Sequence, residues 1–258
     1  MRDRSRTIDI NCDMGEFPAA IADGTQEALM PWLTSVNIAC GGHAGDDATM
    51  RATVEQALRY NLAIGAHPGY PDREHFGRLT MKMSSEDVAE FVTQQVRGLV
   101  CIANELGARV THVKPHGALY NQAATDVTLA AAIAEGIRRT ELGSVLVGLA
   151  GSAMLKVFRD AGFRTVGEAF ADRRYESDGS LRSRKLAGAL IEDADEAAAQ
   201  ALQIATQGTV IATDGKEIRI EAETICIHGD TPGAARIARA VATALRASGF
   251  GLQALGRD

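Results

Sequence analysis

One unit recurs along the chain: a short run rich in β-forming residues, a loop with glycine or proline, and a longer stretch rich in alanine, leucine and glutamate. Parallel strands need helical crossovers, so this unit predicts a parallel sheet covered by helices. The expected strands are 7–11, 36–40, 62–66, 110–113, 144–149, 165–170 and 224–228. The expected helices span about 47–60, 84–106, 126–139, 152–161, 194–207 and 232–247.

Local signals mark several ends of these elements. Ser84 precedes Glu86 and Asp87 and predicts an N-cap. Thr231 followed by Pro232 predicts that the last helix begins with Thr231 as its N-cap and proline at its first position. Asp214-Gly215 lies between the runs 209–213 and 217–223, which predicts a β-hairpin inserted before the last strand.

Composition excludes several classes of protein. The net charge of −6 gives no electrostatic basis for binding nucleic acid or anionic membranes. The basic segment 1–6 lacks the apolar core of a signal peptide, and no apolar run is long enough to span a membrane. The four cysteines form no CxxC pair. We therefore expect one domain over 1–258 in a reducing cytoplasm.

The ends of the expected strands carry most of the reactive side chains. Such residues follow six of the seven strands, and only the fifth, which ends at 149–152, is bare by comparison. An open doubly wound sheet would concentrate them at one switch point, whereas a closed barrel brings all strand ends to one face. We therefore predict an α/β fold in the form of a β/α barrel.

These side chains leave two chemistries open. Histidines near carboxylates suit a divalent-metal site and general acid–base catalysis equally. Lys114 and His116 flank a proline at a strand exit, a spacing that aims both into one pocket, whereas His112 fits a buried structural role as well as a site role. The segment 182–185 fits either an anion-binding loop or an exposed one. No HExxH, GxSxG or P-loop motif is present.

Six ordered segments resemble the lactam-utilisation (LamB/YcsF) family, which comprises the A subunit of the prokaryotic ATP-dependent 5-oxoprolinase. The resemblance runs from about 7 to 250 and is carried by DINCDMGE (9–16), VNIACGGHAGD (36–46), IGAHPGYPD (64–72) with FGR (76–78), HVKPHGALYN (112–121), EAFADRRY (168–175) with DG (178–179), and IHGD (227–230).

The resemblance implies a distorted seven-stranded barrel related to carbohydrate deacetylases. It also implies ATP-dependent opening of 5-oxo-L-proline to L-glutamate, with ADP and phosphate as the other products, in concert with subunits B and C. ATP would be the co-substrate, and the need for a divalent cation stays open.

The motifs supply the candidate residues. The candidate catalytic residues are Asp13, His43, His67, Lys114 and His116. The candidate substrate-binding residues are Asn11, Glu16, Asn37, Asp46, Asp72, Arg78, Tyr120, Asn121, Glu168, Asp172, Arg173, His228 and Asp230. Asp13, His43 and His67 are the candidate metal ligands. Phosphorylation of the lactam oxygen needs a positive charge, for which we consider Lys114 or Arg173. It also needs a base, for which we consider Asp13, His43 or His67.

Two other functions fit the same residues. One is a metal-dependent hydrolase of a sugar or amide, in which the strand-end clusters hold the ion. The other is a non-catalytic subunit that binds a lactam or nucleotide for a partner enzyme.

Overall fold

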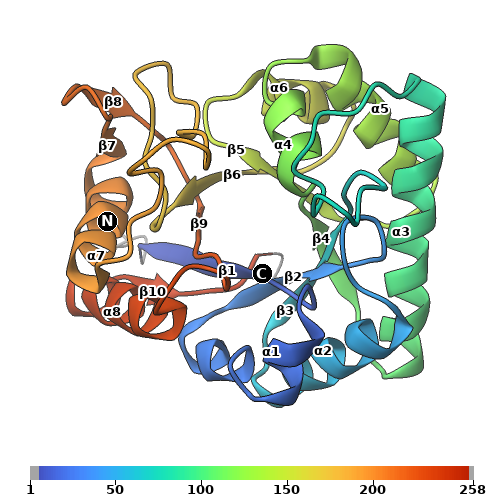
Figure 1. The fold of residues 1–258 in the computed structure, drawn as a ribbon, viewed down its shortest axis with the longest axis horizontal. Helices are drawn as coiled ribbons and strands as arrows, with labels where there is room; N and C mark the ends of the chain where they lie inside the picture. The colour runs from blue at the N-terminus through green and yellow to red at the C-terminus, as the bar shows by residue number, and fades with distance from the viewer. Residues whose placement is uncertain (1–5, 256–258) are drawn as a thin grey trace, which may run out of the picture.

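The computed structural model describes residues 6–255, so the start of the basic segment 1–6 and the last three residues of the expected domain lie outside it. Seven parallel strands form a closed barrel (Figure 1), which confirms the predicted fold and excludes the open sheet. In barrel order the strands are β1 (Thr7–Met14), β2 (Ser35–Ala39), β3 (Ala63–His67), β4 (Val110–Val113), β5 (Val145–Leu149), β6 (Thr165–Phe170) and β9 (Thr224–Cys226). Strand β9 closes the barrel because it pairs with both β6 and β1.

Helices form the outer layer around the strands (Figure 1). The six expected helices are present as α2 (Asp47–Arg59), α3 (Ser85–Glu105), α5 (Val127–Arg138), α6 (Ala153–Asp160), α7 (Ala194–Gln207) and α8 (Ala234–Ala247). Shorter elements not expected from the sequence are α1 (Pro18–Ala22), the 3-10 helix η1 (Glu27–Trp32), α4 (Gly117–Ala123) and β10 (Gly251–Leu252), which pairs with the start of β1. Among the described residues, no helix combines the length and apolarity needed to cross a bilayer.

The local predictions hold with one exception. Ser84 caps α3 by accepting from the backbone N–H of Asp87, and β7 (Thr209–Ile211) pairs antiparallel with β8 (Glu217–Arg219) as the expected hairpin. The predicted start of the last helix is wrong: α8 begins at Ala234 after Gly233, which has a φ of 76°. The Thr231 hydroxyl is not free to cap this helix, because it donates to Asp172 at 2.6 Å.

The apolar core lies between the barrel and the helices, while the inside of the barrel is polar. Successive strand residues point to opposite faces, so Ile8, Ile10 and Cys12 on β1 alternate with Asp9 and Asn11. Asn11 reaches past β9 to Glu168 on β6, at 2.9 Å. This polar interior extends along the barrel to the carboxyl ends of the strands.

Candidate active site

A cavity of about 820 Å³ opens at the carboxyl ends of the strands. Eleven of the predicted site residues line it: Asp13, Glu16, His67, Arg78, Lys114, His116, Tyr120, Asn121, Arg173, His228 and Asp230. Asn11, Asn37, His43, Glu168 and Asp172 are buried and hydrogen-bond to one another or to lining residues, whereas Asp46 and Asp72 lie apart from the lining. The structure therefore brings together residues from strand ends that are distant in sequence.

Lys114 is buried on the cavity floor, between two carboxylates. Its Nζ lies 2.9 Å from Asp13 Oδ1 and 2.8 Å from Glu168 Oε1. Burial alone would lower the pKa of Lys114, but these carboxylates outweigh it and hold the pKa well above its usual value. The cavity therefore has a fixed positive charge at its base.

Both carboxylates beside Lys114 are held by further donors. Glu168 accepts from Asn11 Nδ2 at 2.9 Å and from the Tyr120 hydroxyl at 2.8 Å. Burial would raise the pKa of Asp13, but His67 and Lys114 outweigh it and hold the pKa well below its usual value. Asp13 is therefore ionised and fixed in position.

A buried amide and a buried histidine support Asp13 from below. Asn37 Nδ2 donates to Asp13 Oδ1 at 2.8 Å, and Asn37 Oδ1 lies 2.9 Å from His112 Nε2. Burial lowers the pKa of His112 to about 3, so the ring is neutral and donates through Nε2. A Cβ on Gly65 would lie 2.2 Å from that nitrogen, so this position on β3 requires glycine. His112 thus has the structural role.

One nitrogen of His67 faces one nitrogen of His116 at a distance that requires either a shared hydrogen or a cation between them. His67 Nδ1 donates to the Lys114 carbonyl at 2.7 Å, and His116 Nε2 donates to the Phe76 carbonyl at 2.9 Å. The two remaining nitrogens face each other at 2.9 Å, and two lone pairs cannot approach so closely without a positive centre between them. His67 Nε2 also lies 3.2 Å from Asp13 Oδ2, where a carboxylate favours that positive centre.

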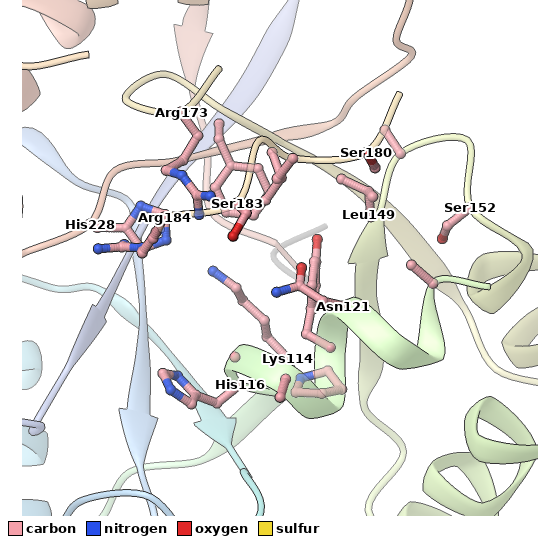
Figure 2. A pocket seen from close by; sticks show the side chains of 18 of the residues that line it. Lys114, His116, Asn121, Leu149, Ser152, Arg173, Ser180, Ser183, Arg184 and His228 are labelled. Atoms are coloured by element: carbon pink, nitrogen blue, oxygen red, sulfur yellow. The ribbon is translucent and has the colours of Figure 1, made fainter. Parts of the chain in front are cut away.

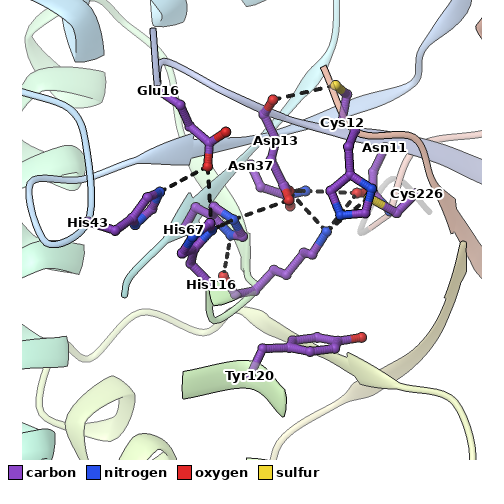
Figure 3. Close-up of polar contacts among 12 residues, drawn as sticks. Asn11, Cys12, Asp13, Glu16, Asn37, His43, His67, His116, Tyr120 and Cys226 are labelled. Atoms are coloured by element: carbon purple, nitrogen blue, oxygen red, sulfur yellow. Dashed lines mark hydrogen bonds and ion pairs between the residues drawn. The ribbon is translucent and has the colours of Figure 1, made fainter. Parts of the chain in front are cut away.

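Two more groups complete this cluster (Figure 3). His43 Nε2 lies 2.9 Å from Glu16 Oε1, and the His43 ring stacks on His116 with centroids 3.5 Å apart. Burial lowers the pKa of both His43 and His116 well below the usual value, so both rings are neutral. Each of Glu16, His43, His67 and His116 offers one atom within 4.8 Å of the others. Three imidazoles and a carboxylate fit a divalent cation such as Zn²⁺.

The opposite wall carries a second histidine–carboxylate pair. His228 Nδ1 lies 2.9 Å from Asp172 Oδ1, and its ring stacks on Phe170 with centroids 5.4 Å apart. Burial would raise the pKa of Asp172. The charge of His228 and the hydrogen bonds that Asp172 accepts outweigh burial, so the pKa of Asp172 is lowered. The pair fixes the ring, which leaves Nε2 of His228 for the cavity.

Asp230 joins two loops at the mouth of the cavity. Its Oδ2 lies 2.6 Å from Arg78 and 3.1 Å from Arg184. Residues 183–185 line the cavity, although Ser183 and Lys185 are also exposed, so the loop fits both interpretations in part.

The two predicted residues outside the cavity have local contacts of their own. Asp46 caps α2 by accepting from the Thr49 backbone N–H at 2.8 Å. Asp72 Oδ1 lies 2.9 Å from His75 Nδ1 in its own loop.

Sequence reasoning missed two residues that contact the site from β9. Thr224 accepts from Asn11 Nδ2 at 2.7 Å, and Cys226 Sγ lies 3.2 Å from Lys114 Nζ. The signal was available, because Thr224, Cys226 and His228 alternate with isoleucine and so share the inner face.

Known proteins resemble this chain over almost its whole length. A model of the LamB/YcsF family matches residues 8–257. The A subunit of a 5-oxoprolinase from Geobacillus kaustophilus is 46% identical over 253 residues, which is 98% of each chain. Its counterpart from Bordetella parapertussis is 46% identical over 247 residues, which covers 96% of this chain and 98% of that one. The crystal structure of a lactam utilization protein from Thermus thermophilus superimposes with a TM-score of 0.89 at 40% identity, covering 96% of this chain and all of that one.

Proposed function

The chain belongs to the LamB/YcsF family, and from this premise we propose that it is the A subunit of a 5-oxoprolinase that opens 5-oxo-L-proline to L-glutamate while converting ATP to ADP and phosphate. The observation that carries the proposal is the 46% identity, over 98% of both chains, to a protein of that name. The word subunit in that name supports a multi-subunit assembly, and we propose subunits B and C as the partners.

The chemistry needs an activated amide. In the proposed reaction, the lactam oxygen attacks the terminal phosphorus of ATP and ADP leaves. Water then adds to the activated carbon, the ring C–N bond breaks, and a second water releases phosphate. Negative charge develops on oxygen in these steps, and a fixed positive charge in a buried site stabilises it. Lys114, held on the cavity floor by Asp13 and Glu168, supports this role.

The geometry also narrows the choice of base. Asp13 and His67 both line the cavity, whereas His43 is buried behind it, against Glu16. We assign the proton transfer from water to Asp13, the ionised carboxylate of the lining, and His67 Nε2, 3.2 Å away, helps to fix its position. His116 holds His67 in place.

A divalent cation forms part of the proposal. Glu16, His43, His67 and His116 would hold it, in place of the hydrogen that His67 and His116 otherwise share. When bound, such an ion polarises a carbonyl or activates water. This cluster is also the observation that favours the second candidate, a metal-dependent amide hydrolase, which would need no ATP.

Variants in the assembled complex test the proposal. With the partner subunits and 5-oxoproline present, glutamate release should require ATP, and Lys114→Met and Asp13→Asn should each lower kcat by roughly 10²-fold to 10³-fold. Lys156→Met is the matched control, since that lysine is exposed and pairs with Asp160 on α6. ATP-independent turnover would favour the metal-dependent hydrolase. Wild-type rates in both site variants would leave the chain a non-catalytic subunit.

A further inference from the structure

Arg173 is a buried cation without an anionic partner. Its side chain lies in the loop between β6 and α7, the residue is 6% exposed, and it lines the cavity. Within residues 6–255, no carboxylate forms an ion pair with it, Nη2 donates only to the Arg182 carbonyl at 2.6 Å, and Nε has no hydrogen-bond partner. Lys114, the other buried cation of this cavity, has two carboxylates in contact.

Such a group is costly in a folded protein. A charge removed from water without a counter-ion in contact strongly destabilises the fold. Burial lowers the pKa of Arg173 to about 10; Arg184 lowers it further, whereas the charge of Asp172 raises it, so the guanidinium still carries its charge at neutral pH. The cavity therefore presents a positive charge that has no ion-pair partner within residues 6–255 and that an entering anion would pair with.

The loop holds Arg173 in a fixed place. Gln200 Nε2 on α7 donates to the Arg173 carbonyl at 2.8 Å, and Arg173 forms an antiparallel bridge with Leu190. A guanidinium on a fixed backbone loses less freedom when it binds a ligand, which favours recognition by two parallel hydrogen bonds.

A second cation lies on the same wall. Arg184 lines the cavity and forms an ion pair with Asp230. The same carboxylate also forms an ion pair with Arg78. Figure 2 shows the Arg173 side chain directed into the interior from one side and Lys114 from the other. Arg173 and Lys114 therefore reach the same cavity from different sides, and of these two only Arg173 has no carboxylate in contact within residues 6–255.

We propose that Arg173, with Arg184 beside it, binds the carboxylate of 5-oxoproline and so orients the lactam carbonyl toward Lys114 and Asp13. The inference rests on the proposed function. In 5-oxoproline the carboxylate and the lactam carbonyl lie on opposite sides of the ring nitrogen, which matches Arg173 on one side of the cavity and Lys114 on its floor. A phosphate group of ATP is the other anion that Arg173 could bind.

The test separates these two anions in the assembled complex. Without ATP, 5-oxo-L-proline and its carboxylate-free analogue 2-pyrrolidinone are titrated calorimetrically; ATP is titrated separately. Arg173→Met should weaken 5-oxoproline binding by at least about 30-fold, which is the loss of one partner from a buried charge pair. It should leave the affinities for 2-pyrrolidinone and ATP within about threefold, and Arg173→Lys should recover part of the loss.

Two controls make the result specific. Arg174→Met removes a neighbouring arginine that pairs with Glu196 on the surface, and it should behave as wild type. Arg173→Met should not lower the Tm of the unliganded complex, because it removes an unpaired buried charge; a merely structural arginine would lower it and leave the KM for 5-oxoproline unchanged.

The outcomes that overturn the inference are distinct from failure of the proposed function. An active complex in which Arg173→Met changes 5-oxoproline affinity by less than about threefold refutes the carboxylate site alone. Loss of ATP affinity instead assigns Arg173 to phosphate and also refutes it. A complex that neither binds nor opens 5-oxoproline refutes both proposals.

Discussion

Asp9 is a buried acid whose protonation should set part of the pH dependence of stability. The residue is 1% exposed inside the barrel, and its carboxylate accepts from the hydroxyls of Thr34 at 2.6 Å, Ser35 at 2.9 Å and Thr224. Burial raises its pKa from 3.8 to about 6, against the opposing effect of these donors. The perturbation we consider is Asp9→Asn, which keeps the shape but cannot titrate.

The magnitude follows from the shift. A rise of about 2 pKa units corresponds to about 3 kcal/mol, at about 1.4 kcal/mol per unit. Because the folded protein holds the proton more tightly than the unfolded chain, this stabilisation is complete below about pH 4 and is lost as the pH rises through about 6. Between about pH 4.5 and about pH 7.5, the free energy of unfolding of the wild type should therefore fall by about 2 kcal/mol relative to that of Asp9→Asn.

Urea unfolding followed by circular dichroism, across that pH range, measures this difference directly. The comparison with the variant is needed because the lowered pKa values of Asp13 and Asp172 act in the opposite direction in both proteins. Asp160→Asn, on the surface of α6, controls for the loss of one negative charge. The reasoning would be refuted if the free energy of unfolding of the wild type minus that of Asp9→Asn stayed constant with pH or increased as the pH rises.

Three further predictions concern the site. Lys114→Met should lower the free energy of unfolding by roughly 3–5 kcal/mol, since it leaves buried carboxylates unpaired, and adding Glu168→Gln should restore part of this loss in urea titrations. His116→Gln should lower the divalent-metal content, measured by elemental analysis after purification, whereas full metal content in the variant would contradict the assigned cluster. Gly65→Ala should cost roughly 1–3 kcal/mol in thermal unfolding because its Cβ meets His112, and an unchanged Tm would contradict that contact.

The barrel could be predicted from the sequence because its signals are local and repeated. Each strand and each long helix is marked by its own residues, and the spread of reactive side chains over six strand ends favoured closure over an open sheet. Proximity in the site also followed from this, since strand ends meet at one face of a barrel.

The contacts within the site could not be predicted, because they join residues far apart in the chain. Thr231 looked like a helix cap, but its hydroxyl binds Asp172, 59 positions earlier. From the sequence, His112 fits a structural role and a site role equally. The structure decides for the structural role, because Gly65 leaves space for the ring and Asn37 Oδ1 lies within hydrogen-bond distance of it. A capping motif depends only on neighbouring residues in the sequence. The partners of Thr231 and His112 come from distant segments, and the register of other strands determines which residues these are.

The closure of β1 onto β9 has a consequence for how the protein folds. Asn11 on β1 binds Thr224, 213 positions later, and Lys114 lies between side chains from β1, β6 and β9. Contacts of such long sequence separation form slowly, because the chain must lose the entropy of a large loop before they stabilise it. On the ribosome, Lys114 therefore has no complete set of partners until β9 has emerged. The last barrel strand to be synthesised completes both the barrel and the site.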